Sequence, residues 1–219
     1  MRKRLTLGIT KIGDLLLKNR ITRTDSGEAL EGIRLTIPEY QRPYKWTVKN
    51  ANQLLDDIEE AMNSNREVYR VGTLILHLDQ DGKYNIVDGQ QRTITFSLLL
   101  DCLGQKPIDF FKQPVSKNQY NLHNVKNNHR ALERRISRIR IDEKDGEELI
   151  RYITDRCELI VVVTDDLSEA FQFFDSQNAR GKTLYPHDLL KAYHLREMNG
   201  VDAEETERIV KMWEDLDQK

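Results

Sequence analysis

The sequence of 219 residues predicts an α+β protein, in which a small mixed sheet is combined with a helical insertion and a helical C-terminal extension. The sheet is predicted by alternating or continuous apolar runs bounded by turn residues, a pattern typical of strands. The helices are predicted by apolar residues that recur every three or four positions. Four strands are expected, at 33–37, 71–78, 83–87 and 157–164.

The first half of the chain is expected to open with a helix. Apolar residues recur at helical spacing over Ile9–Lys18 and predict a short amphipathic helix there. Thr47 is a suitable N-cap for a second helix, which continues to about Met62. Asp79–Gly82 predicts a hairpin-type turn between the second and third strands.

The second half is expected to be mainly helical. Helices are predicted over 93–102, 142–153, 167–177 and 186–198, over at least the second half of 123–140, and from Asp202. We interpret 117–155 as a basic helical insertion in a domain of residues 1–200, and 201–219 as the start of a helical extension. The last helix reaches Lys219 without a stop signal, which predicts that the chain is the front part of a longer protein.

The composition excludes several classes of protein. A net charge of −2 provides no overall field to attract DNA, so a nucleic-acid contact requires a local basic patch. No apolar run approaches the roughly 20 residues of a membrane span, and the basic start is not followed by a signal-type apolar core. We therefore expect a cytoplasmic protein without membrane contact. Cys102 and Cys157 match no metal or redox spacing and are expected to be buried thiols.

The motif Asp88-Gly89-Gln90-Gln91-Arg92 is the strongest functional signal, because it joins a predicted strand to a predicted helix through a glycine turn. Such a turn presents backbone N–H groups to an anion. Arg92 in the first helical turn opposes the helix dipole at a cost of roughly 0.3–1 kcal/mol. A charge-assisted contact with phosphate, at about 1.5–3 kcal/mol, outweighs that cost.

We therefore interpret this motif as a phosphate site for a nucleotide or nucleic acid. Asp88 could hold Mg²⁺ or orient water, and the two glutamines could position water or contact phosphate oxygens. The alternative is that Asp88 caps the helix and Arg92 is a surface residue.

Two further motifs combine loops with polar and charged side chains. Residues 37–46 place Tyr40, Gln41 and Arg42 in a proline-fixed loop that could stack a base and contact phosphate. The alternative is that its aromatic residues fill the core and Arg42 pairs with an acid. Residues 174–184 offer Asn178, Arg180 and Lys182 as a phosphate clamp, or, alternatively, as a helix C-cap.

The predicted helix over 123–140 is strongly basic. Its cations could contact a DNA backbone, or they could form a solvated face paired with the acidic residues 142–148. The DNA-contact candidates are Lys126, Arg130, Arg134, Arg135 and Arg138. His123, Asn124 and His129 superficially resemble a nuclease motif, but their spacing is too short and they open a helix. We predict no nuclease centre and no protein-held metal site.

Taken in order, the motifs IPEYQRPYKW, DGQQR and FDSQNARGKTLYPHDL resemble the N-terminal domain of GmrSD-type modification-dependent restriction enzymes, including the related SspE proteins. The resemblance covers about residues 9–198. It implies a fold similar to ParB and sulfiredoxin proteins, and a domain that works with a C-terminal nuclease or a separate nuclease subunit on modified phage DNA.

The resemblance also implies a nucleoside triphosphate, with Mg²⁺, as the ligand. Asp88, Gln90, Gln91 and Arg92 would bind and hydrolyse it. The same cleft would be lined by Tyr40, Gln41, Arg42, Gly89, Asn178, Arg180 and Lys182. Two alternatives stay open, a non-catalytic DNA-binding module that uses the same cleft and a scaffold with neither ligand. The base of the nucleotide and the oligomeric state, including a homo-oligomer, are not fixed by the sequence.

Overall fold

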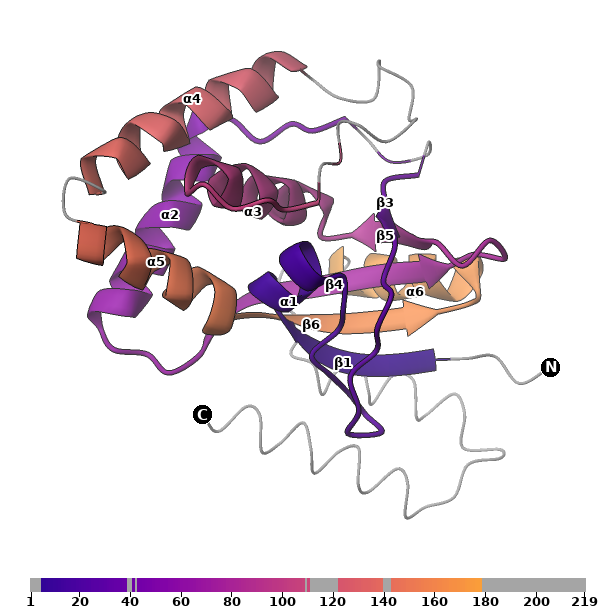
Figure 1. The fold of residues 1–219 in the computed structure, drawn as a ribbon. Helices are drawn as coiled ribbons and strands as arrows, with labels where there is room; N and C mark the ends of the chain where they lie inside the picture. The colour runs from indigo at the N-terminus through magenta and orange to yellow at the C-terminus, as the bar shows by residue number, and fades with distance from the viewer. Residues whose placement is uncertain are drawn as a thin grey trace. The chain divides into compact units, whose positions relative to one another are not determined.

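The computed structural model describes residues 5–38, 41, 43–108, 110, 122–139 and 143–178. The chain divides into two compact units, Met1–Asp166 and Leu167–Lys219. In the second unit the structure describes only the helix α6 (Leu167–Asn178) (Figure 1). The helices predicted over 186–198 and from residue 202 lie outside the described residues.

The first unit is built on a mixed sheet of six strands. In spatial order these are β2 (Arg23–Thr24), β1 (Leu5–Lys11), β6 (Cys157–Thr164), β4 (Tyr69–Leu78), β5 (Tyr84–Asp88) and β3 (Leu35–Thr36). The β1–β6 and β4–β5 pairs are antiparallel, whereas β4–β6 and β3–β5 are parallel. The predicted α+β class is confirmed, while the likeness to ParB proteins stays a prediction.

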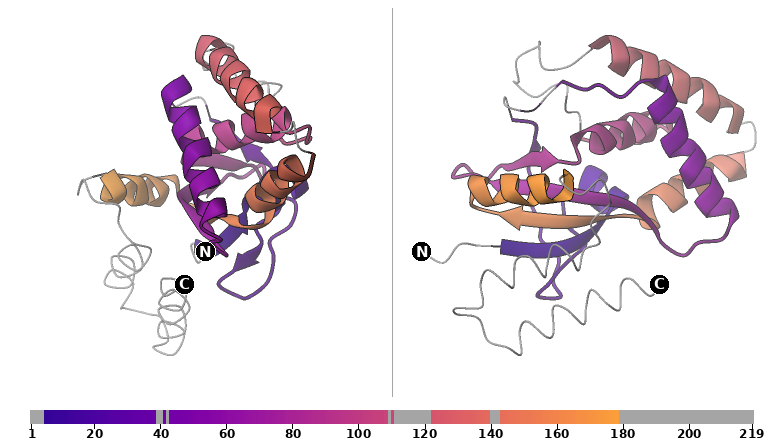
Figure 2. Two further views of the ribbon diagram at one scale, coloured as in Figure 1. Left: turned by 90° about the vertical axis from the view of Figure 1, so that its left-hand side faces the viewer. Right: turned by 180° about the vertical axis from the view of Figure 1, so that it is seen from behind.

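Five helices of this unit lie on one side of the sheet (Figures 1 and 2). They are α1 (Ile12–Lys18), α2 (Val48–Asn63), α3 (Gln90–Cys102), α4 (Leu122–Ile139) and α5 (Glu143–Asp155). The helix α4 packs against both α2 and α3, and α5 packs against α1 and α2. Buried side chains of these helices and of the facing strand residues form one continuous core. The described parts of the predicted basic insertion, α4 and α5, are thus packed against the core of the unit.

The prediction for the start of the chain is wrong in one respect. Residues 9–11 belong to the strand β1, and the helix begins only at Ile12. Ile9 pairs with Ile160 and Leu7 with Val162 of β6, which is the most continuously buried strand. Apolar residues at 9 and 12 suit a strand followed by a helix as well as one helix, so the local pattern could not separate the two.

The other predicted elements within the described residues are confirmed, with shifted ends. The helix α3 begins at Gln90 rather than Thr93, and α4 is helical over its whole length. The strand at 33–37 is reduced to Leu35–Thr36. The helix α2 begins after Thr47, whose backbone N–H donates to Oδ1 of Asn50 over 3.0 Å.

Two further expectations concern the described residues only. Among them, no helix is long and apolar enough to cross a membrane. Cys157 is fully buried and Cys102 half-buried, and both are free thiols. Burial raises the pKa of each thiol to about 12, so neither is a reactive thiolate at neutral pH.

Candidate functional site

The DGQQR motif forms a tight turn between β5 and α3. Gly89 has a φ of 92° and lies between Asp88, which ends β5, and Gln90, which begins α3. A Cβ atom on Gly89 would lie 3.1 Å from the carbonyl oxygen of Thr73 and 3.0 Å from Cδ1 of Leu74. Glycine is therefore required here both by the backbone conformation and by the close approach of β4. The predicted strand, glycine turn and helix are confirmed.

Side-chain amides hold the 41–46 segment against this turn. Nε2 of Gln41 donates to the carbonyl oxygen of Val87, 2.7 Å away, immediately before the motif. Oε1 of Gln91 accepts the backbone N–H groups of Lys45 at 2.7 Å and of Trp46 at 3.1 Å. The first two motifs therefore lie side by side, although about 45 residues separate them. The Gln91 carbonyl is occupied by the protein itself, which makes Gln91 a positioning residue.

The aromatic end of the same segment belongs to the core. Tyr44 is fully buried, and its hydroxyl lies 2.8 Å from Oγ1 of Thr95. Nδ2 of Asn128, on α4, donates to the Tyr44 hydroxyl at 2.7 Å and to the Trp46 carbonyl at 2.9 Å. The alternative interpretation, in which the aromatic residues fill the core, thus holds for Tyr44.

Asn128 is a residue that the sequence interpretation missed. It lies on the same helical stripe as Val125, Leu132 and Ile136, and like them it is buried. An asparagine on an apolar stripe is a recognisable signal, because a buried amide requires partners. The pattern alone could not show that the partners belong to the first motif.

Arg92 does not point freely away from the helix. Its side chain is half-buried, and Nη1 donates to the carbonyl oxygen of Val71, 2.8 Å away, in a bulged part of β4. Gly72 has a φ of 134°, and a Cβ atom there would lie 1.6 Å from Nη1 of Arg92. The guanidinium therefore packs on a glycine of β4. Burial lowers the pKa of Arg92, and the nearby charge of Asp88 partly offsets this effect.

Most N–H donors of the Arg92 guanidinium have no acceptor among the described residues. Val71 is its single hydrogen-bond partner within the described part of the chain. An arginine carries five N–H donors, so four of them have no protein acceptor there. The alternative in which Arg92 is a plain surface residue is wrong, since the side chain is held by β4 beside Asp88.

The two remaining polar residues of the motif differ in exposure. Gln90 is buried, with 4% of its surface exposed, whereas Asp88 is half-buried at the end of β5. Within the described ranges, no three His, Cys, Asp or Glu side chains are grouped closely enough to hold a metal ion.

Several predicted ligand residues are among those that the structure does not describe. Tyr40 and Arg42 lie outside the described residues, as do Arg180 and Lys182. Asn178 is the last residue of α6, and its side chain is also outside the description. The third motif belongs to the second unit, which leaves the joint cleft of all three motifs a prediction.

The helix α4 carries a regular row of cations. Lys126, Arg130, Arg134 and Arg138 follow one another at four-residue spacing, and all four are exposed. Residues four apart lie on one face of a helix. None of the four has an ion-pair partner among the residues that the structure describes. We call these residues the cationic row.

Arg135 differs from its neighbours in the cationic row. Its two terminal nitrogens pair with Oδ1 of Asp56 at 2.6 Å and with Oε2 of Glu59 at 2.5 Å, both on α2. Nη1 also donates to the carbonyl oxygen of Asn52, 3.2 Å away. Arg135 therefore joins α4 to α2, and the partners of this charge lie on α2 rather than in 142–148. We do not assign it to DNA.

The histidines of α4 have ordinary helix-surface partners. Nε2 of His123 lies 2.8 Å from Nδ2 of Asn127, one turn along the helix. Nε2 of His129 lies 2.9 Å from Oδ2 of Asp101 on α3. Both histidines and Asn124 lie on a single helix, as the sequence predicted.

These features define a class of protein: an α+β domain whose polar site is a glycine turn between a strand and a helix, with a second loop hydrogen-bonded to that turn. The chain belongs to the GmrSD restriction endonuclease family, since residues 17–195 match its N-terminal domain. It is therefore a domain of a DNA restriction system. A comparison with individually curated proteins gives no match.

Proposed function

We propose that this chain is the nucleotide-binding, NTP-hydrolysing regulatory domain of a bacterial restriction system that depends on DNA modification. The observation that carries the proposal is the pair of hydrogen bonds from Gln41 to Val87 and from Lys45 to Gln91. They bring the loop of the first motif onto the DGQQR turn, so that residues from both motifs can reach one ligand.

The turn supplies what a triphosphate needs. Backbone N–H groups at the start of α3 favour an anion, and Gly89 gives the turn the positive φ that leads from β5 into this helix. The spare N–H donors of Arg92 would bind phosphate oxygens, and a bound polyanion would offset the cost of burying this cation. Asp88 would hold Mg²⁺ or orient the attacking water. Gln90 and Gln91 would support the turn from within.

The remaining candidates complete the ligand site. Tyr40 and Arg42 flank Gln41 in sequence and would contact the base and phosphates. Asn178, Arg180 and Lys182, which the sequence predicts as a phosphate clamp, would be further ligands of the triphosphate. Turnover of the nucleotide would then regulate a nuclease, either a C-terminal domain or a separate subunit, that cuts modified phage DNA.

A second function is favoured by a separate observation. The cationic row on α4 has no acidic partner within the described ranges, and a phosphate backbone is the common partner of such a row. On this reading the domain binds modified DNA without hydrolysing a nucleotide. Binding of labelled DNA with and without NTP separates the two functions.

The nucleotide proposal is tested with Arg92→Ala. Binding of fluorescent ATP, GTP, UTP and CTP analogues and release of phosphate are measured for the wild-type protein and the variant. We expect binding of the preferred nucleotide to weaken at least about tenfold, the value of one charge-assisted hydrogen bond. Arg156→Ala is the matched control, because Arg156 also donates to a backbone carbonyl, that of Glu67, and is exposed.

A second variant moves the guanidinium of Arg92 without removing it. Gly72→Ala keeps Arg92 but places a Cβ atom where its Nη1 lies, so the guanidinium must move. We expect the same loss of nucleotide affinity, with both variants folded by circular dichroism. Wild-type affinity in both folded variants would contradict the proposal.

A further inference from the structure

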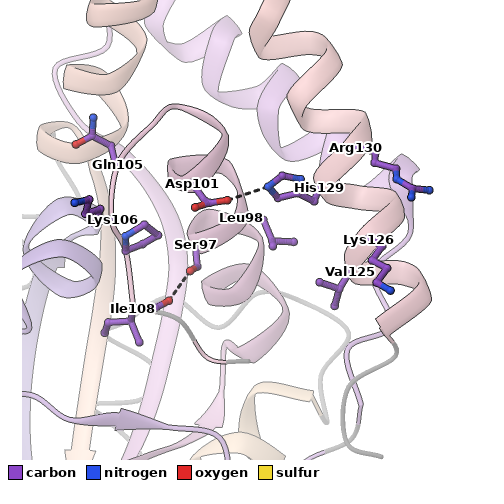
Figure 3. A pocket seen from close by; sticks show the side chains of 11 residues that line it. Ser97, Leu98, Asp101, Gln105, Lys106, Ile108, Val125, Lys126, His129 and Arg130 are labelled. Carbon is purple, nitrogen blue, oxygen red and sulfur yellow. Dashed lines mark hydrogen bonds and ion pairs between the residues drawn. The ribbon is translucent and has the colours of Figure 1, made fainter. Parts of the chain in front are cut away.

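A pocket of about 540 Å³ lies at the opposite end of α3 from the DGQQR turn. Asp101, on its wall, follows Gln90 by eleven residues of helix, which corresponds to roughly 16 Å. No residue of the DGQQR motif lines it. The walls come from the second half of α3, from residues 105–108 and from the first half of α4 (Figure 3).

The walls of this pocket combine apolar and ionic groups. Leu98, Pro107, Ile108 and Val125 provide apolar surface. Figure 3 shows Asp101 and His129 pointing toward each other from the two helices, with Nε2 and Oδ2 2.9 Å apart. An apolar wall beside hydrogen-bonding groups is suited to a heterocyclic base.

The hydroxyl of Ser97 also lines the pocket, but it already has a hydrogen-bond partner in the protein. It donates to the carbonyl oxygen of Ile108 over 2.7 Å. Ser97, His129 and Asp101 therefore do not form a nucleophile, base and acid, because the serine faces a backbone carbonyl and the imidazole Nε2 faces the acid. The pocket is built for binding rather than for covalent catalysis.

Cations dominate the charge around the pocket. Lys106, Lys126 and Arg130 lie along its walls, against the one carboxylate of Asp101. In Figure 3 Arg130 points away from the interior, along the outer side of α4. Lys126 and Arg130 are also the first two members of the cationic row, which continues to Arg138 over roughly 18 Å of helix. The pocket and the row therefore share Lys126 and Arg130.

We propose that this pocket receives one nucleotide of a DNA strand whose backbone follows the cationic row. The base would lie against Leu98 and Val125, and its phosphates would contact Lys126 and Arg130. The continuous row favours a strand over a free nucleotide, because a free nucleotide has no phosphates to reach Arg134 and Arg138. A base in a duplex would have to leave the helical stack to enter. The assignment rests on the proposed function, in which DNA is the substrate of the system.

Two kinds of variant of the full chain test the assignment. Lys126→Glu changes the phosphate contact, and Lys49→Glu, at an exposed lysine on α2, is its matched control. Val125→Phe fills the pocket and leaves all cations in place. The probe is a single-stranded oligonucleotide that carries 2-aminopurine, whose fluorescence rises when the base leaves its stacked neighbours.

We expect each variant to change a different measurement. Lys126→Glu should weaken binding about tenfold or more and lower the salt dependence of binding, by about 0.7 for each phosphate of a single strand that the variant no longer neutralises. Val125→Phe should abolish the rise in 2-aminopurine fluorescence while the salt dependence stays as in the wild type. Lys49→Glu should bind as the wild type does. Thermal unfolding verifies that each variant is folded, and Ile108→Phe, which fills the same pocket from the 105–108 wall, replaces Val125→Phe if the latter fails to fold.

Several results would overturn the assignment. One is a fluorescence rise that persists in the filled pocket, and another is the absence of any DNA binding by the wild-type protein. A third is that Val125→Phe weakens free nucleotides but not DNA, since the ligand would then be a free nucleotide. These results are independent of Arg92→Ala, so failure of the nucleotide proposal at the DGQQR turn is recognised separately.

Discussion

Asn128 on α4 donates a hydrogen bond to the hydroxyl of Tyr44 over 2.7 Å, inside the core of the first unit. The same amide donates to the carbonyl of Trp46 at 2.9 Å. These bonds attach the helix with the cationic row to the loop that lies against the DGQQR turn. A shift of α4 on binding DNA would therefore strain the loop of the first motif, which offers a physical route between DNA contact and the proposed nucleotide site.

Replacement of Asn128 by alanine tests how much this connection stabilises the fold. Asn128→Ala leaves the Trp46 carbonyl without this donor and opens a cavity, so we expect the free energy of unfolding to fall by about 2–3 kcal/mol. Urea unfolding gives the value. Asn127→Ala removes the same amide from a half-buried position on the same helix, where it contacts His123. A change there within about 0.5 kcal/mol is expected, and equal losses in both variants would contradict the assigned role.

The glycine turn can be tested with a matched pair of glycines. Gly89 and Gly27 have similar φ values, 92° and 86°, but a Cβ on Gly27 would meet nothing within 4 Å. Gly27→Ala should cost about 1 kcal/mol from the backbone conformation alone. Gly89→Ala should cost about 1–2 kcal/mol more, because its Cβ also presses on Thr73 and Leu74 of β4. Equal losses in chemical unfolding would show that close approach is unimportant at this turn.

The same turn shows how far the sequence could predict the site. A glycine between an apolar strand and a helical pattern is a local signal, so Gly89 and the start of α3 were predictable to within three residues. The partners of Gln41, Gln91 and Asn128 were not, since each bond joins segments about 45 or more residues apart. Such bonds depend on how loops lie across the sheet, and the periodicity of apolar residues does not predict the course of a loop.

Arg92 shows a second limit of prediction from the sequence. Its place in the first turn of α3 followed from the sequence, and so did the cost of a cation at that end of a helix. The partner that holds it is the carbonyl of Val71, in a β-bulge beside Gly72. A bulge arises from the pairing of two particular strands, here β4 with β6. The local sequence of either strand does not predict which strand it pairs with.

Asp14 predicts a dependence of stability on acid. This buried carboxylate accepts bonds from Thr22 at 2.7 Å, Arg20 at 2.9 Å and Lys18 at 3.0 Å. Burial alone would raise the pKa of Asp14, but the three hydrogen bonds outweigh it and lower the pKa below the ordinary 3.8. The stabilisation is therefore complete above the ordinary pKa and is lost as the pH falls through the lower folded value.

The variant Asp14→Asn should show this directly. At neutral pH its free energy of unfolding should be about 2 kcal/mol lower than that of the wild type, since charge-assisted bonds are lost. The difference should shrink as the pH falls below about 4, where the wild-type carboxylate takes up a proton. Asp81→Asn is the control, because 75% of that side chain is exposed. A difference that stays constant down to low pH would exclude Asp14 as the source.

The neighbours Arg134 and Arg135 give the sharpest test of the DNA surface, because they differ in partners and not in chemistry. Arg134 is exposed in the cationic row, whereas Arg135 pairs with Asp56 and Glu59 on α2. Arg134→Ala should lower the slope of log affinity against log salt by about 0.9 on duplex DNA, the value of one phosphate contact, with stability nearly unchanged.

Arg135→Ala should lower the stability of the protein and leave the salt dependence of DNA binding unchanged. It leaves two acids of α2 without their cation, so we expect the free energy of unfolding to fall by about 1–2 kcal/mol, while the salt dependence of DNA binding stays as in the wild type. Titration of a labelled duplex at several salt concentrations measures the first effect, and urea unfolding the second. If both alanine variants lower the salt dependence equally, the ion pairs with α2 do not decide which arginines meet DNA. If neither does, the cationic row is not the surface that DNA contacts.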